Sequence, residues 1–356
     1  MVQLDGLRAF AVTAVAISHW TPSFLMKALP WGTGVQLFFV LSGFLITGIL
    51  LRCRPEETQG SLLDVLKTFY LRRILRIFPL FYGVLLFCLA VGAGPIRVTW
   101  PWHMAYLSNF YYAYHGHGPA QMDPFLHFWS LAVEEQFYLL WPFLVLTVHR
   151  RVLPVLLIAT LLFSMFFRVV VDRIDPSIVS VRYLTPSCLD ALGIGALLAV
   201  AAHYAGRRAL ARLGWVCAAV GLVGLAVCMG MLPGFVSGVM ARRLGHTFLV
   251  IFYGGLVAGA ALGFPGSIGR LLSWAPLVYL GTISYGVYVY HYFAPIVMEA
   301  VAPALFPSVL TNRPLQLTAY TLFTLIMSVA SWHAFERPIN QLKDRFPYAR
   351  KPGAVR

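Results

Sequence analysis

The chain has 356 residues, of which 59% are hydrophobic and only 11% are charged. An ordinary soluble domain has roughly a quarter of its residues charged, so this composition argues against a soluble fold. The net charge of +14 would suit a nucleic-acid partner, and the positions of the basic residues along the chain test that interpretation.

Apolar segments of membrane-spanning length recur from one end of the chain to the other. As helices they are long enough to cross a hydrocarbon layer of roughly 30 Å. The sequence therefore predicts an all-α integral membrane protein, a bundle of about ten transmembrane helices. We expect a kink at Pro295 in the ninth segment and a re-entrant or interfacial helix over the aromatic residues 100–113. The segments are 7–26, 32–51, 79–94, 127–149, 152–171, 186–203, 213–232, 244–263, 275–303 and 315–335.

The basic residues gather in alternate loops. With the N-terminus inside the cell, 19 of the 27 Lys and Arg residues fall on the cytoplasmic side. Because positive loops stay in the cytoplasm, this pattern places both termini there and explains the charge without a nucleic-acid partner. Residues 1–342 are expected to form the transmembrane domain and residues 343–356 a basic cytoplasmic tail.

Ionisable side chains inside the predicted spans are functional candidates, because each costs on the order of 3 kcal/mol or more in a bilayer. Arg8 and His19 are eleven residues apart in the first span. They therefore share a helix face with an axial separation of ~16 Å. His19 and Glu134 each lie seven residues from the outer end of a span, which predicts equal depth. Glu134 shares a face with Ser130, whereas its neighbour Glu135 points about 100° away.

A histidine beside a carboxylate at one depth suits general-base chemistry. The imidazole of His19 would take a proton from an acceptor hydroxyl, while Glu134 orients the ring and offsets its positive charge. Buried polar pairs also fasten helices together, so an interhelical clamp is the alternative.

Three arginines, Arg72, Arg73 and Arg76, lie immediately on the cytoplasmic side of the third span. Guanidinium groups bind phosphates through paired hydrogen bonds, which makes this cluster a candidate phosphate site. A basic segment beside a membrane span also serves as a topology anchor or contacts lipid headgroups.

Two further positions have both a functional and a structural interpretation. Ser42 and Gly43 lie near the middle of the second span, where small residues allow a helix or a ligand to approach closely. His291 lies deep in the ninth span and is either a second site residue or a hydrogen-bonded structural histidine.

A metal site is not expected. His103, His115, His117 and Asp123 lie in one outer loop, but their spacing matches no specific metal-binding pattern.

Six segments occur in the order of a known family: LDGLRAFAVTAVAISH, FFVLSGFLIT, RRILRIFP, WSLAVEEQFYLLWP, ISYGVYVYH and FERPINQL. On these motifs the chain resembles the acyltransferase type 3 family over nearly all of residues 4–342. The resemblance implies a bacterial inner-membrane enzyme that acylates, usually O-acetylates, a surface polysaccharide, lipopolysaccharide sugar, nodulation factor or macrolide. Many members carry an additional hydrolase-like domain, and the short tail here leads us to expect a stand-alone transferase.

The resemblance also assigns roles to the candidate residues. It implies that His19 is the catalytic histidine of an Arg-x10-His motif and that Ser130 and Glu134 form a Ser-x3-Glu element, with Glu134 assisting His19. From their positions in the predicted spans, we expect Ser42, Ser130, Glu135 and His291 to support the site or bind substrate. Acyl-CoA, in particular acetyl-CoA, would bind its phosphates to Arg8, Arg72, Arg73 and Arg76.

The expected function is acyl transfer from cytoplasmic acyl-CoA to a hydroxyl of an exported glycan such as an exopolysaccharide or O-antigen. A covalent acyl-Ser or acyl-His intermediate is an open variant of this mechanism. The rival interpretation is a transporter or lipid-binding membrane protein without transferase activity.

Overall fold

The structure is a computed structural model and describes residues 1–21, 31–58, 60–93, 95–116, 123–174, 178, 180–230, 238–305 and 308–348. Every element within these residues is a helix, which confirms the predicted all-α class. Within the described ranges, seven helices are long and apolar enough to cross a membrane. The predicted number of about ten spans and the cytoplasmic position of both termini remain predictions.

The helices divide into a long and a short group. The aromatic residues 100–113, predicted as one helix, lie in two short helices, α5 (Ile96–Met104) and α6 (Ser108–His115), separated by residues 105–107. The long helices are α1 (Val2–Trp20), α2 (Gly34–Arg52), α4 (Leu62–Ala90), α7 (Trp129–Thr147), α8 (Leu153–Ile174), α9 (Leu189–Tyr204), α10 (Gly206–Cys228), α11 (Gly238–Leu262) and α17 (Arg313–Ser331). The short helices are α3 (Pro55–Thr58), α5 (Ile96–Met104), α6 (Ser108–His115), α12 (Gly266–Leu272), α13 (Ala275–Thr282), α14 (Ser284–Tyr290), α15 (Phe293–Leu305), α16 (Ser308–Thr311) and α18 (Arg337–Gln341).

Helix α4 extends far beyond the predicted third span. It runs for 29 residues, with the Ser61 side chain accepting a hydrogen bond from the Leu63 amide at its start. Pro79, where the predicted span begins, lies inside this helix. The basic cluster of Arg72 to Arg76 is therefore part of the same helix as the apolar segment, which fixes its position relative to the bundle.

The ninth predicted span is interrupted before Pro295, so the predicted position of the kink is wrong. Helix α14 ends at Tyr290, and α15 begins at Phe293. Pro295 is the third residue of α15, where the backbone N–H groups have no partner within the helix, so its missing N–H costs little. The chain turns at His291 and Tyr292 instead.

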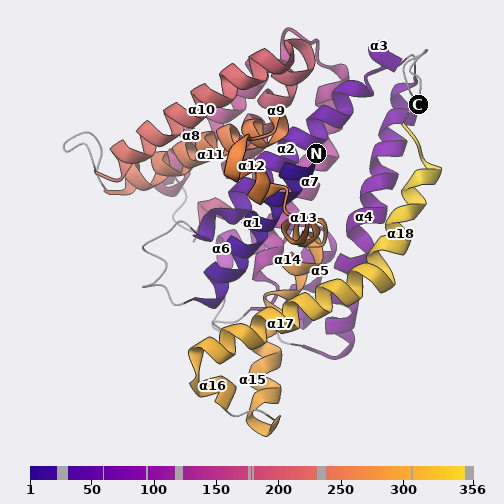
Figure 1. The fold of residues 1–356 in the computed structure, drawn as a ribbon, viewed down its shortest axis with the longest axis vertical. Helices are drawn as coiled ribbons and strands as arrows, with labels where there is room; N and C mark the ends of the chain where they lie inside the picture. Colours follow the sequence, from indigo (N-terminus) through magenta and orange to yellow (C-terminus); the bar gives the residue numbers. More distant parts are fainter. Residues whose placement is uncertain are drawn as a thin grey trace.

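Helices α2 and α9 pack backbone to backbone (Figure 1). A Cβ atom on Gly43 would lie 2.0 Å from the carbonyl oxygen of Leu192, and one on Gly195 would lie 2.0 Å from that of Val40. Only glycine fits at such distances. The tight packing predicted at Gly43 is thus confirmed.

We expect Gly43→Ala to lower the thermal unfolding midpoint in detergent, because its methyl group forces α2 and α9 apart. The cost expected for overpacking is about 1–3 kcal/mol. Gly83→Ala is the matched control, since a Cβ atom at Gly83 would meet no atom within 4 Å. An unchanged midpoint for Gly43→Ala would show that the two helices can separate without loss.

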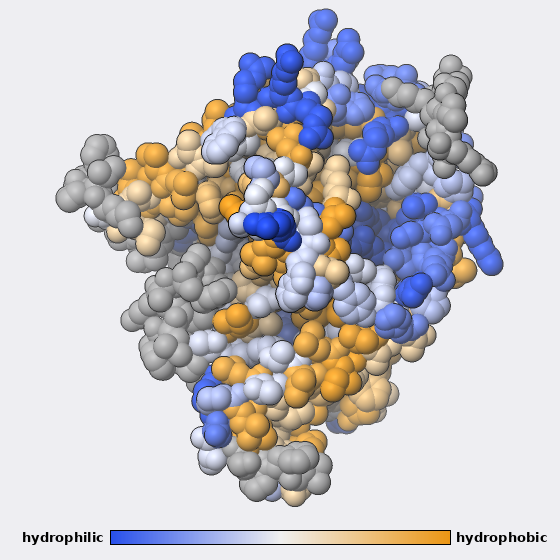
Figure 2. All heavy atoms as spheres, in the orientation of Figure 1, coloured by the Kyte–Doolittle hydropathy of each residue, from blue (hydrophilic) through white to orange (hydrophobic). Residues whose placement is uncertain are grey.

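Apolar side chains cover much of the outer surface. Figure 2 shows them over a broad face of the molecule, with hydrophilic side chains gathered at its upper end and beside α18. On α10, Trp215, Leu222 and Val223 are exposed. So many large, exposed apolar side chains are unusual in a soluble protein and fit contact with lipid.

Candidate active site

Two cavities adjoin inside the helix bundle. The larger one, here named the basic cavity, has a volume of about 940 Å³. The smaller one, the inner cavity, has a volume of about 360 Å³. Ile49, Arg73 and Arg76 line both, so the two cavities are neighbours.

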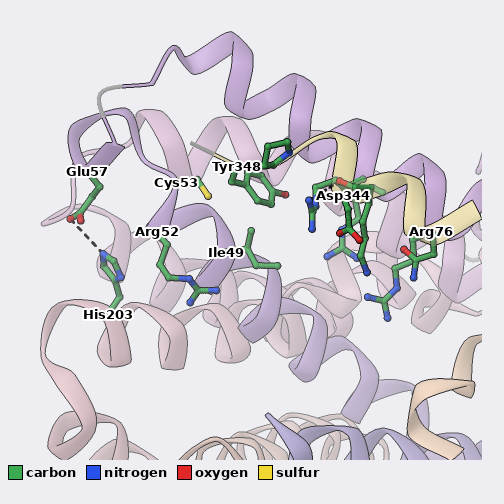
Figure 3. Close-up of a pocket in the computed structure, with 13 residues that line it drawn as sticks. Ile49, Arg52, Cys53, Glu57, Arg76, His203, Asp344 and Tyr348 are labelled. Atoms are coloured by element: carbon green, nitrogen blue, oxygen red, sulfur yellow. Dashed lines mark hydrogen bonds and ion pairs between the residues drawn. The ribbon is translucent and has the colours of Figure 1, made fainter. Parts of the chain in front are cut away.

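The basic cavity carries an excess of positive charge. Its five cationic side chains face two carboxylates. Figure 3 shows Arg52 of α2 and Arg76 of α4 on opposite sides of the cavity, with Asp344 and Tyr348 of the C-terminal segment above them. Glu57 is already paired with His203 at 3.7 Å. The remaining excess charge favours an anionic ligand. The cations are Arg52, Arg72, Arg73, Arg76 and Lys343, and the carboxylates are Glu57 and Asp344.

The C-terminal segment forms one wall of the basic cavity. Arg72 donates hydrogen bonds to the carbonyl oxygens of Lys343 and Phe346, at 3.0 and 2.8 Å. Its guanidinium also lies over the ring of Tyr348, 5.1 Å from the centroid. Burial raises the pKa of the Tyr348 phenol to about 12, so this side chain adds no negative charge at neutral pH. Arg72 thus holds the wall in place.

Arg73 and Arg76 keep their N–H donors available. Arg73 lies over the ring of Tyr138, 5.0 Å from the centroid. Among the described residues, no hydrogen bond or ion pair is formed by either guanidinium. Both therefore present free donors to the two cavities. Arg8, which lines the inner cavity, forms an ion pair with Asp5 at 3.7 Å.

Glu134 and Ser130 both line the inner cavity. They share a helix face, as predicted. The Tyr138 hydroxyl donates to Glu134 Oε2 at 3.1 Å and is also bonded to the Ser42 hydroxyl. Ser42, Tyr138 and Glu134 therefore form one chain of hydrogen bonds along the cavity wall. Glu135 is not among the residues lining either cavity.

Tyr288 also lines the inner cavity. This hydroxyl donates to the carbonyl oxygen of His127 at 2.6 Å and is bonded to the Ser130 hydroxyl. The Tyr288 ring also contacts His127 and His291, with centroid separations of 5.3 and 5.6 Å. Tyr288 thus separates the cavity from a layer of histidines.

His19 belongs to this histidine layer and is not paired with Glu134. Its Nδ1 lies 2.9 Å from Nε2 of His291, and its ring packs against Tyr292. No hydrogen bond or ion pair between His19 and Glu134 is present in the described part of the chain. The predicted pairing is therefore wrong. Helix α1 ends at Trp20, one residue after His19, so His19 does not lie seven residues inside the end of its helix as predicted.

The aromatic segment between α4 and α7 holds His103 and Asp123 in a buried cluster. The Tyr112 hydroxyl donates to Asp123 Oδ2 at 2.7 Å and lies 3.4 Å from His103 Nε2. His115 instead stacks on Tyr111, and His117 lies outside the described residues. No group of three or more His, Cys, Asp and Glu side chains in the described ranges is placed to hold a metal ion.

Sequence reasoning missed three residues of this region: Tyr138, Tyr288 and His127. Tyr138 lies four residues after Glu134, a spacing that brings side chains together on a helix. Tyr288 lies three residues before His291. Among the residues that the structure describes, no hydrogen-bond partner is present for either ring nitrogen of the buried His127. The helical spacing could have indicated the two tyrosines, whereas only the tertiary structure brings His127 to His291.

Comparison with known proteins identifies the family. A family model described as an acyltransferase domain matches residues 1–333. The chain is 31% identical to the putative peptidoglycan O-acetyltransferase YrhL of Bacillus subtilis, over 94% of this chain and 54% of the relative. It is 32% identical to the O-acetyltransferase OatA of Staphylococcus aureus, over 81% of this chain and 49% of the relative.

A third relative, the peptidoglycan O-acetyltransferase OatA of Listeria monocytogenes, is 30% identical over 92% of this chain and 52% of its own length. The chain spans about half the length of these curated relatives. No solved structure matches it significantly. Since the family model matches residues 1–333, most of the chain, the chain belongs to the acyltransferase type 3 family.

Proposed function

We propose that the chain is a membrane O-acetyltransferase that takes an acetyl group from acetyl-CoA and transfers it to a hydroxyl of a cell-envelope glycan. The observation that carries this proposal is the pair of adjoining cavities, in which Arg73 and Arg76 have free guanidinium donors. A basic cavity of about 940 Å³ is at the upper end of the roughly 300–1,000 Å³ typical of ligand pockets.

The charges suit a phosphorylated donor. Phosphate groups accept paired hydrogen bonds from guanidinium groups, and the basic cavity offers Arg52, Arg73 and Arg76 beside Lys343. The narrower inner cavity would then take the pantetheine arm. Arg8 lines this cavity, and the α1 helix carries His19 a further ~16 Å along its axis. An extended arm starting at the basic cavity spans a distance of that order.

The chemical step follows from a basic imidazole beside a hydroxyl acceptor. His19 takes the hydroxyl proton as the oxygen attacks the thioester carbonyl carbon. The C–O ester bond forms, the C–S bond breaks, and the CoA thiolate takes the proton from the imidazolium. The products are an O-acetylated acceptor and CoA thiol. This proposal is supported by Tyr288, which lines the inner cavity and contacts His291 of the histidine layer.

The acceptor proposal rests on the relatives. Two of them are named as peptidoglycan O-acetyltransferases, so we propose a peptidoglycan sugar hydroxyl in place of the exopolysaccharide or O-antigen expected from the sequence. The proposed enzyme lies in the bacterial plasma membrane, with the basic cavity open to the cytoplasm and the histidine layer towards the outer side.

Arg76→Gln should weaken acetyl-CoA binding by roughly 10- to 100-fold, because charge-assisted hydrogen bonds contribute about 1.5–3 kcal/mol. Binding of acetyl-CoA to protein in nanodiscs, measured calorimetrically, tests this. Arg208→Gln is the matched control, since Arg208 is exposed on α10 and lines neither cavity. Equal acetyl-CoA affinities of the wild type and Arg76→Gln would contradict phosphate binding by Arg76. They would favour the alternative, in which the basic cluster serves as a topology anchor.

The function itself is tested by incubating the protein in nanodiscs with radiolabelled acetyl-CoA and soluble peptidoglycan strands. Base-labile label on the glycan, accompanied by release of CoA thiol, is the expected result. Tight acetyl-CoA binding without transfer to glycan would contradict the proposed acceptor. Failure to bind acetyl-CoA would favour the transporter or scaffold interpretation.

A further inference from the structure

The histidine layer contains a hydrogen-bond chain that the proposed chemistry does not by itself require. His291 is fully buried at the turn between α14 and α15. Its Nδ1 lies 2.6 Å from the carbonyl oxygen of Tyr288, and its own carbonyl oxygen accepts a hydrogen bond from Trp20 Nε1 at 2.9 Å. The ring is thus fixed by α14 on one side and by the end of α1 on the other.

The carbonyl partner determines which nitrogen of His291 carries the proton. A carbonyl oxygen only accepts hydrogen bonds, so His291 Nδ1 must bear the hydrogen. In a neutral imidazole the other nitrogen, Nε2, then has a lone pair and is an acceptor. The 2.9 Å contact between the two rings therefore requires His19 Nδ1 to be the donor.

The neutral state of His291 follows from its surroundings. Among the described residues, its hydrogen bonds and ring contacts are with His19, Trp20, His127, Tyr288 and Tyr292, none of which carries a negative charge. An imidazolium buried there would have no carboxylate to compensate it, which is unfavourable. A single hydrogen bond between two neutral rings accounts for the 2.9 Å distance between His19 Nδ1 and His291 Nε2.

We propose that His291 is a positioning residue that holds His19 in the tautomer with a proton on Nδ1 and a free lone pair on Nε2. This inference rests on the proposed role of His19 as the base, and it deepens that role. The nitrogen that accepts a proton in catalysis is set by the hydrogen bond made by the other nitrogen. His291 occupies the place that Glu134 has in the sequence-based prediction.

Packing limits rotation of the His19 ring as well. The His19 and His291 rings have a centroid separation of 5.0 Å and planes inclined by 28°, which fits two rings joined end to end by the hydrogen bond. Tyr292 packs against the His19 ring at 4.8 Å with the planes inclined by 63°. His19 remains exposed despite these contacts. The arrangement therefore orients the ring while leaving it reachable by an acceptor.

The tautomer can be read directly by nitrogen NMR of protein labelled with 15N in the histidine rings and reconstituted in nanodiscs. The His19 signals are identified by their loss in His19→Gln. We expect a protonated Nδ1 and an unprotonated Nε2 for His19 in the otherwise unchanged protein. A protonated Nε2 on neutral His19 would overturn the proposal, and this measurement needs no variant of His291 to fold.

Two substitutions of His291 separate positioning from packing. The amide oxygen of His291→Gln can accept the His19 proton, so the tautomer and most of the acetyl transfer should be retained. His291→Leu has no acceptor, and we expect a shift of His19 towards the Nε2–H tautomer with a loss in kcat of about 10- to 100-fold. Acetyl-CoA affinity should be the same in both variants, because His291 lines neither cavity.

The outcomes distinguish this inference from the proposed function. An unchanged His19 tautomer in folded His291→Leu, or equal losses of transfer in the Leu and Gln variants, would overturn the positioning role. If the otherwise unchanged protein shows the expected tautomer but transfers no acetyl group, the proposed function fails and the tautomer assignment stands.

Discussion

His19→Gln is expected to lower kcat for acetyl transfer by about 10²–10⁴-fold, the range typical for loss of a general base. Acetyl-CoA affinity should not change, because His19 lines neither the basic nor the inner cavity. The measurement is the rate of label transfer from acetyl-CoA to glycan, together with calorimetric binding of the donor.

His333→Gln is the matched control for this experiment. His333 is exposed, and its Nε2 is 3.0 Å from the Tyr279 hydroxyl, outside the histidine layer. Its rate should match that of the unsubstituted protein. Full transfer by folded His19→Gln would remove His19 from the mechanism and leave the histidine layer as a structural element.

A second large effect is expected at a buried ion pair far from the cavities. Arg168 of α8 and Asp190 of α9 lie 2.7 Å apart, with 4% and 0% of their surfaces exposed. Arg168 also donates to the hydroxyls of Ser164 and Thr247, at 2.9 and 2.5 Å, and to the carbonyl oxygen of Ser187. The guanidinium thereby joins α8, α9 and α11.

Asp190→Ala should destabilise the protein by about 3–5 kcal/mol, because it leaves the Arg168 guanidinium buried without a counter-charge. The double variant Arg168→Met/Asp190→Leu should recover most of this loss, since an apolar pair of similar volume carries no such penalty. Thermal unfolding of the purified protein in detergent, followed by tryptophan fluorescence, compares the three proteins.

Equal unfolding midpoints for Asp190→Ala and the unsubstituted protein would contradict this account. A double variant less stable than Asp190→Ala would show that the hydrogen bonds to Ser164 and Thr247 matter more than the charge pairing. Acetyl-CoA binding by the surviving folded protein should be unaffected, because neither charged residue lines a cavity.

The roles of individual arginines could be predicted only in part. The sequence placed Arg72, Arg73 and Arg76 together because they are neighbours on one helix. It could not show that Arg72 binds the carbonyl oxygens of Lys343 and Phe346, which lie 271 and 274 residues away. It also could not show that Arg73 and Arg76 keep free donors. Such differences arise from contacts between distant segments.

The sequence by itself determined the helical class, the apolar segments and the family. It also placed Arg8 and His19 on one unbroken helix, because hydropathy and helical spacing are local properties of the chain. The tertiary structure, in contrast, decided which side chain forms a hydrogen bond with His19. Its partner, His291, is 272 residues away, and the contact depends on where α1 ends and where the chain turns before Pro295. Neither boundary is fixed by residue spacing, since helix ends depend on the packing of the whole bundle.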